Sequence, residues 1–278
     1  MRTPGYERPW TDSWQSKSVI EMASAERPAR NTQLIVVIYV VALIAAQASA
    51  TFLSIEFTLV CNSVLLLVLL NHFALVPASA EMRNVLASIA LVPLLRIESV
   101  ALPQHFISSA YWGTLPMALV LATVYWLRRV TNPSDALPRF ELSPARVWPA
   151  QLAMALLGVL FAVASAYAVS ALDLTSAQPS LVSTPGAVLL VAAFSGVTLE
   201  IVFRGVIQPG LVALCGWHGI ALTSGLYAAI FIGSGSWFFV VLAFATGLVW
   251  GAFSAVTRRV TGVAGSHALF AMTWAALF

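Results

Sequence analysis

Long apolar stretches dominate this sequence and constrain its fold more than any other feature. A transmembrane helix needs about 20 consecutive, mostly apolar residues, and nine stretches of the 278-residue chain approach or meet that length. Apolar residues make up 60% of the chain and charged residues 9%, whereas a soluble domain carries about 25% charged residues. The sequence therefore predicts an all-α, polytopic bundle of transmembrane helices.

Eight or nine spans are predicted, because two of the nine stretches are weak. The third contains Pro93, Arg96 and Glu98, so a bend is expected there, and the seventh is short. The predicted spans cover residues 34–55, 57–78, 84–102, 110–127, 148–172, 186–208, 219–233, 236–257 and 262–278.

The positively charged residues support nine spans with the N-terminus on the cytoplasmic side. Of the 14 lysine and arginine residues, only Arg96 and Arg204 fall inside predicted spans. All the others lie before the first span or after the second, fourth and eighth spans, on one side of the membrane. Cytoplasmic loops are rich in lysine and arginine, so the net charge of +3 reflects topology and gives no case for nucleic-acid binding.

Four regions are predicted along the chain. Residues 1–33 form a polar cytoplasmic tail, and residues 34–127 form an N-terminal region of four spans. A proline-containing cytoplasmic loop, residues 128–147, separates this region from a five-span C-terminal domain, residues 148–278. The first apolar stretch is a full span rather than the short apolar core of a signal peptide. A multi-pass protein of an inner or plasma membrane is therefore expected.

A glutamate and an arginine interrupt the sixth span, in the segment LEIVFRGVIQPG. Glu200 and Arg204 are four positions apart, which places both side chains on one face of a helix. A lone charge in mid-membrane costs at least about 2.5–3.5 kcal/mol on insertion scales, so we expect a buried ion pair. The pair either neutralises itself inside the bundle or lines a polar cavity that holds a functional site.

Three segments of the C-terminal domain together resemble a known family. In chain order they are LEIVFRG, WHGIALTSGLYAAIF and LAFATGLVWGAFSAVTRRVTGVAGSHALFA. Their order and spacing resemble the CPBP family of intramembrane proteases, which includes CAAX prenyl-protein endopeptidases and Abi-like, bacteriocin-processing enzymes. The family motifs are Glu-Glu-x-x-x-Arg, an aromatic residue followed four positions later by His, and His followed four positions later by Asn or a similar residue.

The resemblance makes Glu200, Arg204 and His267 the candidate catalytic residues, because they occupy retained motif positions. In the family, the second Glu and the Arg of the first motif mainly hold the helix and its cavity in shape. The last His helps to stabilise an oxyanion. The resemblance therefore implies a supporting role for Glu200 and Arg204 and an oxyanion role for His267, whose alternative is a hydrogen-bonded core histidine.

Apolar residues stand where the family places its other catalytic groups. Leu199 replaces the first Glu, Phe231 replaces the His four positions after Tyr227, and Ala271 replaces the Asn. In the family, that Glu and that His activate a water molecule, and general acid–base catalysis contributes about 10²–10⁴-fold. The loss of one oxyanion donor costs about 10²–10³-fold more. The replacements therefore predict impaired proteolysis.

Two further charged residues lie inside a predicted span. Glu98 could reach Arg204 or His267 across the bundle and take part in chemistry. Alternatively, Arg96 extends toward the membrane surface, as long basic side chains do, and Glu98 is satisfied nearby.

Other chemistries have weaker signals. The sequence has no HExxH or comparable ligand spacing, and Cys61 and Cys215 indicate neither a disulfide framework nor a zinc site. We expect no metal and no cofactor. A serine protease that uses Ser234 or Ser236 with His267 as its base is a minor alternative, because a Gly-Ser run between two spans is usually a loop.

Aromatic and small residues indicate how the helices meet lipid and one another. Tryptophans near span ends fit an aromatic belt at the membrane surfaces, and they are Trp112, Trp126, Trp148, Trp217, Trp237 and Trp250. Small residues recur on helix faces that either pack internally or dock another membrane protein, and they include Gly225, Ala228, Ala229, Gly247, Gly251 and Ala255.

Two functions from different classes remain. In the first, the protein is a pseudoenzyme that acts as an adaptor or accessory subunit by binding another integral membrane protein. In the second, it is an active but divergent intramembrane endopeptidase that cleaves membrane-associated peptides or proteins through Glu200, His267 and Glu98. The apolar replacements favour the first. Membrane lipids are the other expected partners.

Overall fold

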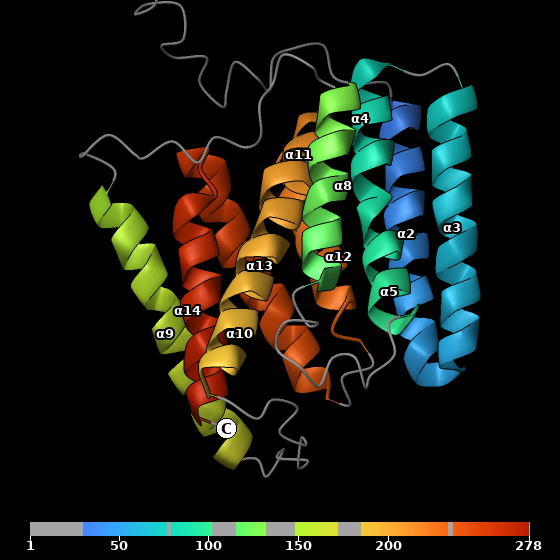
Figure 1. Ribbon diagram of the computed structural model, residues 1–278. Coiled ribbons are helices and arrows are strands. Elements are labelled where there is room, and N and C mark those ends of the chain that lie inside the picture. Colours follow the sequence, from blue (N-terminus) through green and yellow to red (C-terminus); the bar gives the residue numbers. More distant parts are fainter. Residues whose placement is uncertain are drawn as a thin grey trace, which may run out of the picture.

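Helices fill the described part of the chain and run up and down through one bundle (Figure 1). The computed structural model describes residues 30–76, 79–101, 115–131, 148–171, 185–232 and 236–277. No strand occurs within these ranges, and every predicted span contains a helix. The all-α membrane bundle is therefore confirmed. Five helical segments in these ranges are long and apolar enough to cross a membrane alone, and they are residues 30–52, 55–75, 148–171, 193–215 and 237–257.

In the described part of the N-terminal half, a helical hairpin is followed by a broken helix. The helices are α2 (Arg30–Phe52), α3 (Ile55–Leu75), α4 (Ala80–Ile89), α5 (Leu91–Ala101) and α8 (Leu115–Thr131). The break between α4 and α5 falls at Ala90, three residues before Pro93. Pro93 lies in the first turn of α5, where its missing N–H would have had no partner within the helix. The helix is therefore broken within the third span, where a bend was expected.

In the C-terminal half, the sixth predicted span is longer than expected. The helices are α9 (Trp148–Ala171), α10 (Pro185–Glu200), the π-helix η2 (Ile201–Ile207), α11 (Gln208–Cys215), α12 (His218–Ala229), α13 (Trp237–Thr257) and α14 (Thr261–Leu277). The span was predicted to end at residue 208, but the helix continues to Cys215. Pro209 does not end it, because the π-helix stops at Ile207 and Pro209 falls in the first turn of α11, a position that tolerates proline.

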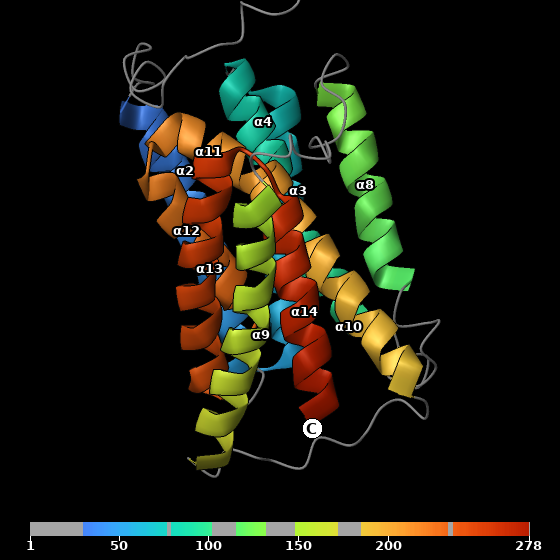
Figure 2. The same cartoon turned by 90° about the vertical axis from the view of Figure 1, so that its left-hand side faces the viewer.

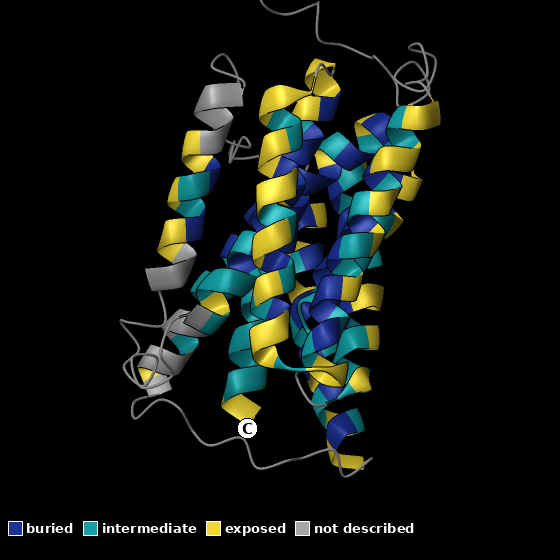
Figure 3. Cartoon of the chain, turned by 90° about the vertical axis from the view of Figure 1, so that its right-hand side faces the viewer, coloured by how far each residue is buried: buried dark blue, intermediate teal, exposed yellow. Residues whose placement is uncertain are grey.

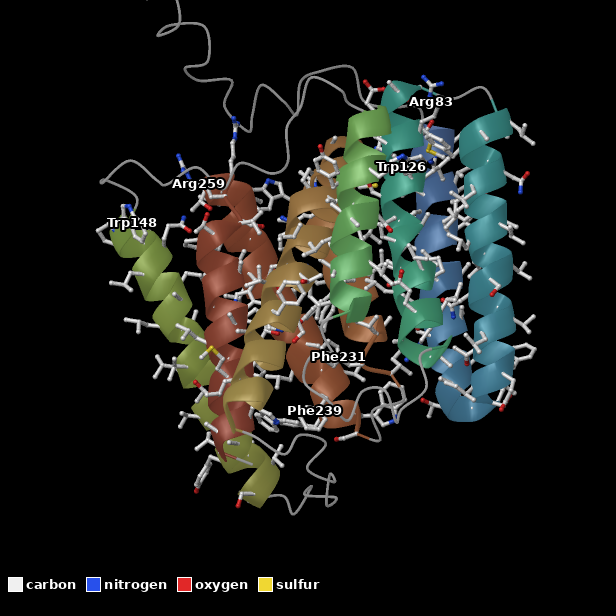
Figure 4. The ribbon with its side chains drawn as sticks, in the orientation of Figure 1. Arg83, Trp126, Trp148, Phe231, Phe239 and Arg259 are labelled. Atoms are coloured by element: carbon white, nitrogen blue, oxygen red, sulfur yellow. The ribbon has the colours of Figure 1, made fainter. Side chains whose placement is uncertain are left out.

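Basic residues gather at one end of the bundle. Arg83 and Arg259 lie at the same end in Figure 4, although they belong to opposite halves of the chain. Helix α2 begins at this end, and the C-terminus lies at the other (Figure 1). An odd number of helical passes accounts for this arrangement.

One continuous core joins the two halves. Leu43 and Leu86 from the N-terminal half belong to the same buried cluster as Leu211 and Trp250 from the C-terminal half. The contacts run from α2 to α12 and from α4 to both η2 and α11. Side chains on the outward faces of the peripheral helices are exposed, as Figure 3 shows for the side of the bundle that it faces. The domain boundary at residues 128–147 remains a prediction.

Glycines on the inner faces allow close helix packing. A Cβ atom on Gly247 would lie 3.2 Å from Ser224 Cβ, and one on Gly251 would lie 2.8 Å from Ile220 Cγ2. On the other side of the bundle, α9 packs along α14 (Figure 2), where a Cβ atom on Gly158 would overlap the carbonyl group of Ser266. Of the two interpretations of the small residues, internal packing is confirmed at Gly247 and Gly251.

Candidate functional site

A π-helix aligns the polar residues of the candidate site. Glu200 is the last residue of α10, Arg204 lies in η2, and Gln208 is the first residue of α11. A π-helix forms i→i+5 hydrogen bonds and has wider turns than an α-helix. Residues four apart therefore lie more nearly in line than they would in an α-helix. All three side chains are buried within the bundle.

Glu200 has two partners, one on its own helix and one on α14. Its Oε2 lies 3.4 Å from Arg204 Nε, and its Oε1 lies 2.9 Å from His267 Nδ1. The alignment of the arginine contact is not that of a hydrogen bond, so it is an electrostatic contact between charges. The predicted buried pair of Glu200 and Arg204 is confirmed, and the shorter contact to His267 was not predicted.

Arg204 also bonds to α13 and to an aromatic ring. Its Nη2 donates to the carbonyl oxygen of Gly247 at 3.0 Å, and its Cζ lies 5.1 Å from the centre of the Tyr227 ring. A Cβ atom on Gly247 would lie 3.3 Å from Arg204 Nη2. Glycine at position 247 therefore gives the guanidinium its access to the helix backbone. Gln208 makes the same kind of bond one turn further, to the carbonyl oxygen of Gly251 at 2.8 Å.

His267 links the carboxylate to a tyrosine hydroxyl. The Nδ1 of His267 lies 2.9 Å from Glu200 Oε1, and a neutral imidazole that donates through Nδ1 has an acceptor at Nε2. The hydroxyl oxygen of Tyr227 lies 3.4 Å from this Nε2. The imidazole ring also stacks on Trp250, with ring centres 4.8 Å apart and planes inclined by 29°. His267 is thus a buried histidine that joins Glu200 on one side to Tyr227 on the other.

Trp250 is part of this cluster, which corrects its assignment to an aromatic belt. Its side chain is 1% exposed, whereas Trp126, Trp148 and Trp237 are 64%, 48% and 56% exposed. Position 250 lies well inside α13 (Trp237–Thr257) rather than near its end. Its place well inside the predicted span 236–257 was the feature of the sequence that could have indicated burial. Trp112 lies outside the described residues.

The three replaced motif positions carry apolar side chains, and Phe231 is the one shown to contact the cluster. Phe231 contacts Tyr227 edge to face, with ring centres 5.4 Å apart, and Leu199 packs partly buried against the core. Ala271 follows His267 by four positions on α14. These side chains neither donate nor accept a proton. Among the residues that the structure describes, no group of three or more His, Cys, Asp or Glu side chains could hold a metal ion.

The remaining candidates lie apart from this cluster. Among the described residues, Glu98 bonds to neither Arg204 nor His267, and one of its oxygens is buried without a hydrogen-bond partner. Ser236 accepts a hydrogen bond from Phe238 N at 3.3 Å and caps α13. Ser234 lies outside the described residues.

Arg96 does not extend toward the membrane surface as expected. Its Nε donates to Gln47 Oε1 at 2.7 Å, and its Nη2 donates to the carbonyl oxygen of Ile232 at 2.9 Å. These acceptors lie on α2 and just after α12, inside the bundle. An arginine that finds polar acceptors within the protein has no need to reach the aqueous interface.

Comparison with known proteins agrees with the motifs. Searches among curated proteins and among solved structures gave no match. A family model described as "Type II CAAX prenyl endopeptidase Rce1-like" matches residues 179–273. This segment contains Glu200, Arg204, Tyr227 and His267. The C-terminal half of the chain is therefore similar to type II CAAX prenyl endopeptidases of the Rce1-like kind, as the three motifs predicted.

Proposed function

We propose that this protein has lost proteolysis and acts by binding another integral membrane protein, as an adaptor or accessory subunit. The main support for the lost proteolysis is that Glu200, Arg204 and His267 form a cluster that is buried inside the bundle. Glu200, Arg204 and His267 are 0%, 2% and 6% exposed, and Glu200 contacts both of the others directly. A carboxylate already held by a histidine and an arginine is poorly placed to activate water.

The chemistry of amide hydrolysis explains why this burial matters. The reaction needs a base for the attacking water and donors for the oxyanion. Leu199 and Phe231 supply no base, and Nε2 of His267 faces the Tyr227 hydroxyl. The missing base and its partner account for about 10²–10⁴-fold in rate. With Ala271 in place of an amide donor, about 10²–10³-fold more is lost.

One contact favours a second candidate, a divergent endopeptidase. A carboxylate that holds Nδ1 of a histidine leaves Nε2 free to act as a general base, as in hydrolytic triads. Glu200 and His267 have this arrangement at 2.9 Å. In this protein the base would have to exchange its contact with Tyr227 for a water molecule.

We expect no specific cleavage of a prenylated CAAX peptide by the purified protein in detergent or nanodiscs. Product formation should be the same for the wild type, Glu200→Gln and His267→Ala, because no group activates water. Ser63→Ala, at an exposed position on α3, is the control for preparation and folding. Cleavage that either cluster variant abolishes and that Ser63→Ala retains would establish the endopeptidase instead.

Association is tested on the same variants. The protein is isolated from its native membrane in mild detergent, and its companions are quantified by mass spectrometry. A stoichiometric membrane protein should remain bound to Glu200→Gln and His267→Ala, because both side chains are buried and do not reach the surface that a partner contacts. A monomeric, companion-free protein would contradict the adaptor.

In the proposed topology, the protein lies in an inner or plasma membrane. Its N-terminus is in the cytoplasm and its C-terminus is on the opposite side of the membrane. The clustering of Arg83 and Arg259 at one end of the bundle supports it (Figure 4), because cytoplasmic ends are rich in basic residues. A C-terminal fusion to a reporter that is active only outside the cytoplasm should therefore be active. Activity of a cytoplasm-only reporter at that position would show an even number of spans.

A further inference from the structure

Helix α12 is too short to cross a membrane. Its 12 residues, His218–Ala229, extend about 18 Å at 1.5 Å per residue, whereas the hydrocarbon core is about 30 Å thick. The chain continues through tight turns, in which Phe231 N bonds to Ala228 O and Ile232 N bonds to Ala229 O. Ala229 and Ile232 are both buried, so the C-terminal end of α12 lies inside the bundle.

The end of a helix leaves carbonyl groups without partners within the helix. Inside a membrane bundle, where water is scarce, each of these groups needs a partner from the protein. The carbonyl end of a helix also carries the negative end of the helix dipole, which favours a cation. A positively charged hydrogen-bond donor would therefore stabilise the end of α12.

Arg96 of α5 supplies this donor. Its Nη2 bonds at 2.9 Å to the carbonyl oxygen of Ile232, three residues beyond the last residue of α12, at the end of the turns that continue the helix. Among the residues that the structure describes, its guanidinium donates hydrogen bonds to neutral acceptors and to no carboxylate. The charge is thus directed at the carbonyl end of α12 rather than at an acidic side chain.

A chain of buried amides holds Arg96 in place. Arg96 Nε donates to Gln47 Oε1 at 2.7 Å, Gln47 Nε2 donates to Asn62 Oδ1 at 2.8 Å, and Asn62 Nδ2 donates to Thr58 O at 2.8 Å. Gln47, Asn62 and Thr58 are fully buried. This network ties α2, α3 and α5 to the end of α12, so the guanidinium has a fixed position.

We infer that Arg96 is a positioning residue for the candidate site. It belongs to the N-terminal half, outside the Rce1-like segment, and it caps the end of α12. The turn that it holds contains Phe231, which stands at a motif position and contacts Tyr227. Tyr227 in turn contacts His267 and Arg204. The inference goes beyond the proposed function, because an adaptor and an endopeptidase would both need α12 in place.

The test compares hydrogen exchange of the α12 end in Arg96→Met, Arg96→Lys and the wild type. Deuterium uptake is measured by mass spectrometry on the full-length protein in nanodiscs, for peptides that cover residues 226–232. Loss of a hydrogen bond to a charged group predicts roughly ten- to hundredfold faster exchange in Arg96→Met. Arg96→Lys keeps the cation and should restore at least part of the protection. Peptides from α9 should exchange as in the wild type.

Arg83→Met is the matched control, because it removes an equal charge from an exposed position on α4. If Arg96→Met is not recovered folded, Gln47→Met replaces it, since it removes the anchor of Arg96 and keeps the charge. Gln47→Met should then accelerate exchange of the same peptides. The inference is wrong if these peptides exchange at the wild-type rate, if Arg83→Met has the same effect, or if exchange rises equally throughout the bundle.

Discussion

Replacing Glu200 with alanine should destabilise the folded protein by about 3–5 kcal/mol, the usual cost of removing one partner from a buried ion pair. Arg204 would remain buried with its charge facing only the Gly247 carbonyl and the Tyr227 ring. His267 would lose the acceptor of its Nδ1. Reversible unfolding in mixed detergent, or thermal unfolding followed by fluorescence, measures the loss.

Two further variants identify the cause of that loss. A double change of Glu200 and Arg204 to leucine and methionine should recover part of the stability, because no uncompensated charge remains. Glu81→Ala, at an exposed position in the first turn of α4, should cost less than about 1 kcal/mol. If Glu200→Ala is as stable as Glu81→Ala, the cluster is solvated and its buried arrangement is refuted.

Gly158→Ala should destabilise the protein by about 1–3 kcal/mol or more, as overpacking of a tight interface does. The added methyl group would overlap the backbone carbonyl of Ser266, which a side-chain rotation cannot relieve. Helix α9 would have to move away from α14, the helix that carries His267. The melting temperature in a fixed detergent is the measurement.

Gly186→Ala is the matched control for this change. No atom lies within 4 Å of the position of its added Cβ, and alanine is the better helix former. Its melting temperature should therefore stay the same or rise. Equal losses at positions 158 and 186 would show that the close approach of α9 and α14 does not exist in the membrane protein.

The fold was largely predictable from the sequence because each membrane helix is determined by its own consecutive residues. Membrane helices satisfy their own backbone hydrogen bonds within one segment of about 20 residues, so apolar length in the sequence identifies them. The pair of Glu200 and Arg204 was predictable for the same reason, since both partners lie within five consecutive residues of one helix. The bend before Pro93 likewise follows from a single residue.

The rest of the site depends on contacts between distant segments. His267 is 67 positions from Glu200, and nothing in its own segment indicates which carboxylate it meets. Arg96 was expected at the membrane surface because its acceptor Ile232 is 136 positions away and is a backbone carbonyl, which any residue provides. Trp250 was assigned by residue type, whereas its burial depends on how α13 meets α14.

The π-helix marks a place where this chain can vary in length. Segment Ile201–Ile207 accommodates more residues per turn than an α-helix, so deleting one of them would let the helix close into regular α geometry. The wider turns hold the extra residue without turning the flanking helices, so its loss would leave those helices in nearly the same relative orientation. The same deletion within a regular α-helix would rotate everything beyond it by about 100°, the angle that one residue spans. Gln208 would therefore still face the carbonyl oxygen of Gly251. Related sequences should lose one residue between positions 200 and 208 more readily than within α13.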